Sequence, residues 1–296
     1  MLVGTAIAFT VKQKVIPSVS FIKNNISYNR EEATQGAVSQ PSPQVESSMP
    51  ASPTLSPTPS PTPIPKPSVS PPVTSNSSSA TSGGNYTVLT FGIGSTVVTD
   101  TAAEDDCDNN CPVKSLAQFI ADNGGRAGMN GTYFCPPDYA WCSGKVNTFD
   151  FPVWNNRKKK WMEADKLFWN GRGMMVFRPG SAQFFPNAAA AGAPSDITGG
   201  ILNYPSLLAG GKLILDEGSL AENMKTKGTR SGIGFGGGKI FLVVARRANM
   251  KDLAGIFLSL GATDAMNLDG GGSVALYDGG YRAGPGRSLP NAIIIK

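Results

Sequence analysis

The stretch MNLDGGGSVALY (residues 266–277) brings together residue types that can carry out chemistry. Its polar and glycine positions are, in order, Asn267, Asp269, Gly270, Gly271, Gly272 and Ser273. Three consecutive glycines weaken a helix or a strand, so a compensating role is expected. Their backbone N–H groups can point into one concavity and bind an anion. A simple glycine turn between two strands stays open as the alternative, because Asp also favours turns.

A second feature that can bind an anion lies in KTKGTRSGIG (residues 225–234), where Arg230 stands among small residues. Arginine presents a rigid planar fork that matches phosphate or carboxylate, which lysine does not. The alternative is a surface arginine at the start of a strand.

The chain contains no histidine. This excludes a Ser-His-Asp triad, a Cys-His pair and any metal bound by histidine. The glycine spacing matches neither G-x-G-x-x-G nor the P-loop, which disfavours a nucleotide-binding fold. Proton transfer therefore depends on Asp, Glu, Tyr or Lys, and carboxylate chemistry is what remains.

The four cysteines are Cys107, Cys111, Cys135 and Cys142. Their spacings are not the C-x2-C pairs of structural zinc sites. Disulfides are the better interpretation for an exported chain. Three pairings are open, and we favour the two local ones because each closes a loop beside a functional-looking segment.

The elements that must position these residues can be located from local patterns. Strands are expected at 86–91, 96–99, 239–245 and 292–295. One helix is expected from Val113, and another after Asn249, which can cap it. Two helix-to-strand units, FIADNGGRAGMNG and FLSLGATDAMNLDG, each end in Met-Asn, at Asn130 and Asn267. We therefore expect an α/β or α+β fold, with a mixed β-sheet core and at least two helices in β-α-β-type units, and a ligand at the strand ends.

Composition divides the 296 residues into three parts. Residues 1–20 are a candidate remnant of a signal-anchor, because an apolar run is followed by lysines. Residues 21–84 are Ser/Thr/Pro-rich and are expected to form a disordered linker. Residues 85–296 then form a single globular domain. We expect export to the periplasm, the cell surface or the medium, with membrane or cell-wall tethering through the N-terminus.

The net charge of +5 is too small to predict a nucleic-acid partner. The one dense basic run is RKKK (157–160), between Trp154 and Trp161. We interpret it as a solvated loop or hairpin tip in preference to a polyanion contact.

Four motifs in this order resemble the phosphodiester glycosidase family: NGTYF (130–134), TRSGIG (229–234), DAMNLDGGGS (264–273) and GRSLPNAIII (286–295). The segment LLAGGKLILDEG (207–218) also resembles a family hairpin. The resemblance implies hydrolysis of the glycosidic bond in a sugar-1-phosphodiester of a phosphate-linked glycan. Two departures, AGPG at 283–286 and the segment between Cys135 and Cys142, indicate that the substrate can differ from that of well-studied members.

The resemblance also implies roles for individual residues. Asp269, Arg230, Asn267 and Asn130 are the expected catalytic residues. The expected substrate-binding residues are Gly131, Tyr133, Thr229, Gly270, Gly271, Gly272, Ser273 and Arg287. A second carboxylate is open among Asp264, Glu217 and Asp150. No cofactor is expected; a divalent cation such as Ca²⁺ stays open, although Asp269 and Asn267 alone make a poor Ca²⁺ cage. The runner-up function is a non-catalytic module that binds anionic glycopolymers of an exopolysaccharide or the cell wall.

Overall fold

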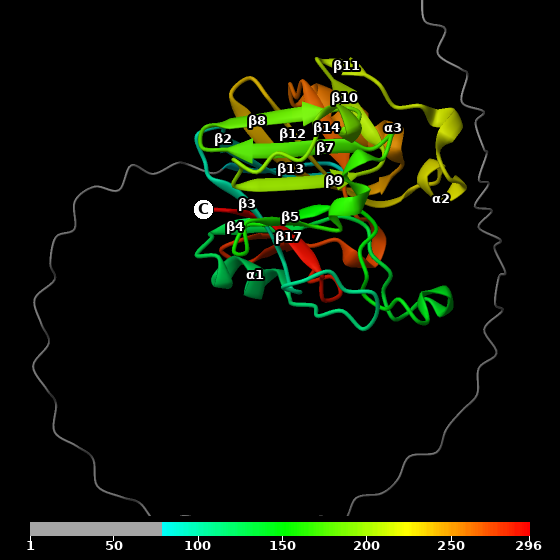
Figure 1. Cartoon of the computed structure of the whole chain (residues 1–296). Helices are drawn as coiled ribbons and strands as arrows, with labels where there is room; N and C mark the ends of the chain where they lie inside the picture. The colour runs from blue at the N-terminus through cyan, green and yellow to red at the C-terminus, as the bar shows by residue number, and fades with distance from the viewer. Residues whose placement is uncertain (1–78) are drawn as a thin grey trace, which may run out of the picture. The chain divides into compact units, whose positions relative to one another are not determined.

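The computed structural model describes residues 79–296 (Figure 1). The expected signal-anchor remnant at 1–20 and nearly all of the expected linker lie outside the described residues. Strand β1 (Ser79–Gly83) falls within the range assigned to the linker and pairs with β2 (Tyr86–Gly92), so ordered structure begins before residue 85. No helix in the described part of the chain is long and apolar enough to cross a membrane.

The largest sheet has seven strands in the order β1-β2-β13-β12-β14-β10-β11. Beyond β1 and β2, its strands are β13 (Lys239–Ala248), β12 (Gly228–Gly236), β14 (Asp264–Asn267), β10 (Ser206–Ala209) and β11 (Lys212–Leu213).

Two five-stranded sheets complete the described fold. One contains, in spatial order, β16 (Tyr281–Ala283), β15 (Leu276–Asp278), β4 (Ala127–Asn130), β17 (Asn291–Ile295) and β3 (Val97–Thr101). The other contains β6 (Lys160–Met162), β5 (Val153–Asn155), β9 (Gly199–Asn203), β7 (Gly173–Arg178) and β8 (Ser181–Phe185).

The helices begin where local capping signals place them. The Ser115 side chain caps α1 (Leu116–Asp122), and Asn249 forms a capping box with Asp252 at the start of α3 (Met250–Ser259). The remaining α-helix is the short α2 (Glu222–Lys225). Five 3₁₀ turns complete the elements: η1 (Ala140–Cys142), η2 (Ala164–Phe168), η3 (Ala188–Ala190), η4 (Glu217–Ser219) and η5 (Gly271–Ser273).

The predicted α/β or α+β fold class is wrong, because the described chain is mostly β-sheet and every strand pairing in it is antiparallel. Helix α1 connects β3 to β4, but β17 lies between these two strands and pairs with both. Helix α3 connects β13 to β14, and β12 lies between them. The two strands joined by each helix run in the same direction, but an antiparallel strand separates them and they share no hydrogen bonds, so neither predicted unit is a β-α-β unit of paired parallel strands.

Strand β13, in the interior of the seven-stranded sheet, is buried on both faces. In β13, Ile240, Leu242 and Val244 face a core shared with the other two sheets. The alternate residues, Phe241 and Val243, face a second cluster that includes α3. This period of two on a strand buried on both sides explains why KIFLVVA is apolar throughout.

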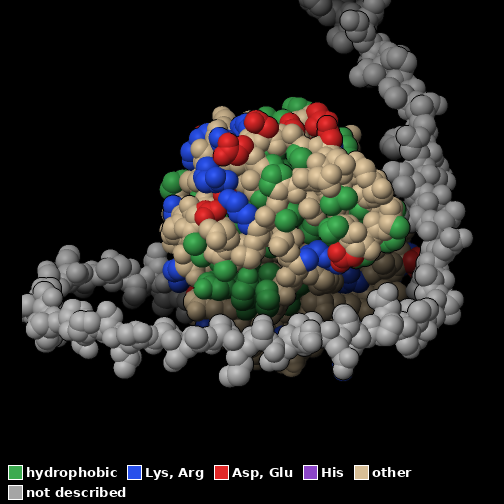
Figure 2. All heavy atoms as spheres, turned by 90° about the horizontal axis from the view of Figure 1, so that it is seen from below, with side chains coloured by type: hydrophobic (Ala, Val, Ile, Leu, Met, Phe, Trp, Pro, Cys, Tyr) green, Lys and Arg blue, Asp and Glu red, His purple; other side chains and the backbone are tan. Residues whose placement is uncertain are grey.

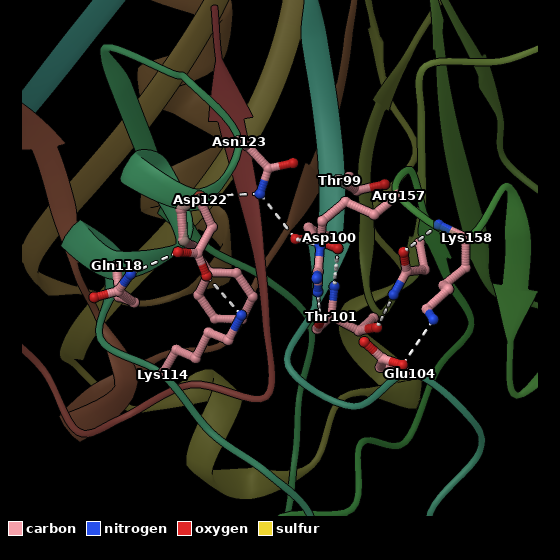
Figure 3. Close-up of polar contacts among 12 residues, drawn as sticks. Thr99, Asp100, Thr101, Glu104, Lys114, Gln118, Asp122, Asn123, Arg157 and Lys158 are labelled. Atoms are coloured by element: carbon pink, nitrogen blue, oxygen red, sulfur yellow. Dashed lines mark hydrogen bonds and ion pairs between the residues drawn. The ribbon is translucent and has the colours of Figure 1, made fainter.

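A buried carboxylate joins α1, β3 and the β5–β6 hairpin (Figure 3). Asp100 is fully buried and accepts hydrogen bonds from Asn123 Nδ2 (2.8 Å), Arg157 Nε (2.7 Å) and the Thr101 amide (3.0 Å). The basic run therefore has acidic partners, and Lys158 pairs with Glu104 nearby. On the face shown in Figure 2, acidic and basic side chains lie next to one another and form no continuous basic surface.

Candidate active site

The glycine-rich stretch begins where β14 ends. Gly232 of β12 pairs with Asn267, the last residue of β14, and Leu268 is buried immediately after it. Asp269 is the first partly exposed residue of the segment, and η5 follows. Asp269 therefore lies at the surface, directly after a strand that is anchored in the core.

The two asparagine-bearing segments, far apart in the chain, meet at Asp269. The Asp269 amide donates to the Gly131 carbonyl (3.0 Å), and Asn130 Nδ2 donates to the Asp269 carbonyl (2.9 Å). Ser231 Oγ donates to the same carbonyl (2.7 Å). Asn130 is fully buried, and its side-chain oxygen accepts from the Ala275 amide (3.2 Å). Both side-chain polar atoms of Asn130 are therefore bonded within the protein, and its side-chain amide nitrogen holds the Asp269 backbone.

Gly131 leaves space that another side chain fills. A Cβ at this position would lie 1.9 Å from Asn291 Oδ1, which accepts a hydrogen bond from the Thr132 amide (2.9 Å). Thr132 Oγ1 in turn donates to Asn203 Oδ1 (3.0 Å), and Asn203 Nδ2 donates to the Asn267 carbonyl (2.9 Å). Buried polar contacts thus fix both loops from behind.

This supporting layer is what sequence reasoning missed: its members outside the expected set are Thr132, Asn203, Ser231 and Asn291. Three of them lie inside the quoted motifs NGTYF, TRSGIG and GRSLPNAIII, where small polar residues in apolar surroundings were an available signal. Asn203, in ILNYP, had none.

Asn267 is buried and only partly satisfied. Its Nδ2 donates to the Tyr133 hydroxyl and to the Tyr204 carbonyl (3.2 Å). Its Oδ1 is buried without a hydrogen-bond partner. An unpaired buried acceptor is costly, and a hydroxyl donor from a ligand would satisfy it.

The environment of Asp269 suits proton transfer near neutral pH. Burial raises the pKa of this carboxyl to about 7, against the lowering effects of the Ser273 hydroxyl, the Gly270 amide and Arg287. The Gly270 amide donates to Asp269 Oδ1 (2.8 Å). Burial also raises the pKa of Tyr133; the charge of Asp269 adds to this increase, and that of Arg230 opposes it. Tyr133 therefore lies within electrostatic reach of both predicted catalytic charges.

Arg230 is largely committed to the backbone. Its Nη2 donates to the Asn223 and Thr226 carbonyls, and its Nε donates to the Ala248 carbonyl (3.2 Å). The other terminal nitrogen, Nη1, faces Gly270: a Cβ built there would be 3.6 Å from it, and 3.0 Å from the Thr229 carbonyl. Burial lowers the pKa of Arg230, but a guanidinium remains charged at neutral pH.

The glycine triplet forms a smaller anion cradle than three free amides would. The Gly270 amide is taken by the Asp269 side chain. Gly271 is left-handed (φ 59°), and both Gly271 and Gly272 are exposed, with no acceptor for their amides among residues 79–296. A pocket of about 290 Å³ adjoins them, lined also by Thr229, Arg246 and the segment 283–286 that departs from the family pattern.

Arg287 connects the signature loop to a disulfide-bonded loop. Its amide donates to the Gly272 carbonyl (2.9 Å) and its Nη1 to Ser273 Oγ (3.2 Å). Its Nη2 pairs with Asp138, which lies between Cys135 and Cys142. The disulfides are Cys107–Cys111 and Cys135–Cys142, so the favoured local pairing is confirmed.

Of the three candidates for a second carboxylate, Asp150 remains. Asp264 accepts hydrogen bonds from the Gly210 amide and Thr263, and Glu217 pairs with Lys251. The Asp150 amide donates to the Tyr133 carbonyl (2.9 Å), and the charge of Asp150 raises the pKa of Asp269. No group of three His, Cys, Asp or Glu side chains suited to a metal ion occurs within the described residues.

The comparison with family models identifies the chain. The model for phosphodiester glycosidase matches residues 123–296, which contain every predicted catalytic residue. The chain belongs to the phosphodiester glycosidase family. No curated protein matches it.

Two solved structures are similar to this chain at low sequence identity. One is the catalytic domain of zebrafish N-acetylglucosamine-1-phosphodiester alpha-N-acetylglucosaminidase, auto-inhibited by its pro-peptide, with 15% identity and a TM-score of 0.51; the match covers 71% of this chain and 76% of that one. The other is a hypothetical protein from Synechocystis, with 14% identity, a TM-score of 0.48 and 74% of this chain covered. The chain spans 61% of the Synechocystis protein.

Proposed function

We propose that this chain is an exported hydrolase that cleaves the glycosidic bond of sugar-1-phosphodiesters in a phosphate-linked glycan. Water adds across the bond, so that the anomeric carbon gains the hydroxyl and the phosphate keeps the bridging oxygen as a phosphomonoester. Two disulfides fit an oxidising compartment and support export. The observation that carries the proposal is the gathering of Asp269, with a pKa of about 7, Tyr133 and Arg230 around one loop.

The proposed role of Asp269 is that of a general base for water. A base works best when its pKa lies near the working pH, and Asp269 meets that condition. The free Oδ1 of Asn267 then accepts a hydrogen bond from a sugar hydroxyl and orients the ring. The hydroxyl of Tyr133, held by Asn267 Nδ2, completes the sugar side of the site.

The proposed role of Arg230 is to stabilise the departing phosphate. Nη1 and the exposed amides of Gly271 and Gly272 are donors available on this side. A phosphate is a weak base and leaves with little protonation, whereas ordinary glycosidases need an acid for an alcohol leaving group. Fixed donors aimed at a growing negative charge contribute about 3 kcal/mol each to lowering the barrier.

The test uses the full chain and an N-acetylglucosamine-1-phosphodiester with a methyl aglycone, the sugar being that of the zebrafish relative's name. We expect release of free sugar, and a fall in kcat of at least about tenfold for Asp269→Asn. Asp264→Asn is the matched control, because it changes a carboxylate at the start of β14, the strand that leads to Asp269. If the Asp269→Asn variant hydrolyses the substrate at the wild-type rate, Asp269 is not the general base. Binding of the substrate by the wild-type chain without sugar release would favour the non-catalytic module.

A further inference from the structure

The loop closed by Cys135–Cys142 presents two aromatic rings to solvent. Trp141 is 63% exposed, the highest value among the large apolar side chains of the described residues, and Tyr139 is 39% exposed. Their ring centroids lie 4.6 Å apart with 16° between the planes. Side chains of this size are seldom left exposed together without a binding role. We call these two residues the aromatic platform.

The platform is held rigidly. The disulfide fixes both ends of the loop, and η1 forms inside it, with the Cys142 amide donating to the Tyr139 carbonyl (2.9 Å). The Cys135 amide donates to the Thr148 carbonyl (2.9 Å), which ties the loop to the following segment. Rings fixed in this way lose little conformational freedom when a ligand covers them.

The platform is continuous with the signature loop through Arg287. The Arg287 guanidinium lies 5.4 Å from the centroid of the Tyr139 ring, as a cation–π contact, and pairs with Asp138. The same guanidinium donates to Ser273 Oγ, and it lies against Gly272, where a Cβ would be 2.9 Å from Nη2. A chain that leaves the glycine loop on this side therefore meets Arg287 and then the platform.

We propose that the aromatic platform is a subsite for a sugar ring of the aglycone, beyond the phosphate, so that the substrate is an oligosaccharide or polysaccharide phosphodiester. This inference rests on the proposed function, because the phosphate is placed against the glycine loop. A pyranose has an apolar C–H face that packs on an aromatic ring and a rim of hydroxyls. Charged Asp138 and Arg287 border the platform and provide partners for that rim, whereas a protein partner would need a broader apolar surface.

The experiment compares two substrates in the full chain: N-acetylglucosamine-1-phosphodiester with a methyl aglycone and the same diester with a mannotetraose aglycone. The readout is the ratio of kcat/KM for the long substrate to that for the short one. Trp141→Ala is expected to lower this ratio about tenfold, and Trp141→Phe, which keeps a ring, to retain most of it. Leu258→Ala, which removes an exposed apolar side chain from α3, is the control and leaves the ratio unchanged.

An unchanged ratio in Trp141→Ala would overturn the subsite while leaving the proposed hydrolase intact. If the wild-type chain hydrolyses neither substrate, the proposed function fails, and calorimetric titration with the long diester decides the subsite separately. Binding by the wild type that weakens about tenfold in Trp141→Ala would then support the subsite. Equal binding by the two proteins would overturn it.

Discussion

As the proposed general base, Asp269 has to be accessible and to have a pKa near neutral, and its surroundings meet these two needs by different means. The Asn130 and Ser231 side chains donate to its main-chain carbonyl, and its amide donates to the Gly131 carbonyl. Its backbone is therefore held without the carboxyl, which bonds the Gly270 amide and the Ser273 hydroxyl. Burial without a counter-ion in direct contact then raises its pKa to about 7.

The raised pKa predicts how stability changes with pH. The folded state binds the Asp269 proton up to about pH 7, whereas an unfolded carboxyl releases it near pH 3.8, so this group makes folding less favourable as pH rises between those values. Asp269→Asn removes the ionisable group. We expect the variant to match the wild type near pH 4 and to exceed its unfolding free energy by roughly 1–2 kcal/mol at pH 8, since partial exposure reduces the effect. Denaturant unfolding at the two pH values measures this, and a variant that is less stable at pH 8 would contradict it.

Asp150 predicts a shift in the pH profile of activity. Its negative charge raises the pKa of Asp269, so Asp150→Asn should move the acidic limb of kcat/KM to lower pH. A carboxylate with a merely structural role would change the rate without moving the limb. Glu217→Gln is the control, because Glu217 pairs with Lys251 and its charge is not among those that shift Asp269. If the acidic limb stays in place in Asp150→Asn, the charge of Asp150 does not influence the titration of Asp269 during catalysis.

At the scale of elements, the local signals were predictable and the pairings were not. Caps at Ser115 and Asn249 and the apolar run of β13 are written in a few adjacent residues, so both helices and the strand were expected. The insertion of β17 between β3 and β4 depends on the last residues of the chain and has no local signature. The same cause hid Asn203, which reaches the site only because β9 lies close to β14 in space.

Asp100 shows how one residue fixes several elements, and its removal tests that role. Asp100→Ala leaves Arg157 without its carboxylate and Asn123 Nδ2 without this acceptor. We expect a loss of about 2–4 kcal/mol in unfolding free energy, because Arg157 is partly exposed and keeps its bond to the Thr101 carbonyl. The matched control is Glu104→Ala, whose ion pair with Lys158 is exposed and whose loss should leave the unfolding midpoint unchanged. Equal effects of the two variants would mean that burial of Asp100 contributes nothing.

At the scale of the whole described fold, three sheets share one core and the disulfide loops lie at its edge. The large core cluster takes residues from β2, β3, β4, β7, β13 and β17, so these strands should open together. The disulfides close loops with sequence separations of only 4 and 7 residues. The first loop contacts the segment that follows the second: the Cys111 amide donates to the Val146 carbonyl (3.0 Å), and Asn147 Nδ2 donates to the Cys111 carbonyl (3.2 Å). The Asn147 amide in turn donates to the Cys135 carbonyl (2.6 Å).

This arrangement predicts that loss of one disulfide loosens the other loop before it loosens the sheets. In the double variant Cys107→Ala/Cys111→Ala, we expect faster amide hydrogen exchange at residues 105–115 and 135–148 and unchanged exchange in β13 and β17. Chain entropy limits the loss to about 2 kcal/mol for so short a loop. Hydrogen exchange followed by mass spectrometry resolves these segments, and Ser143→Ala, an exposed position beside the second disulfide, is the control. Faster exchange in β13 would place the first disulfide within the cooperative core. Exchange confined to 105–115 would instead show that the aromatic platform is held independently of the neighbouring loop.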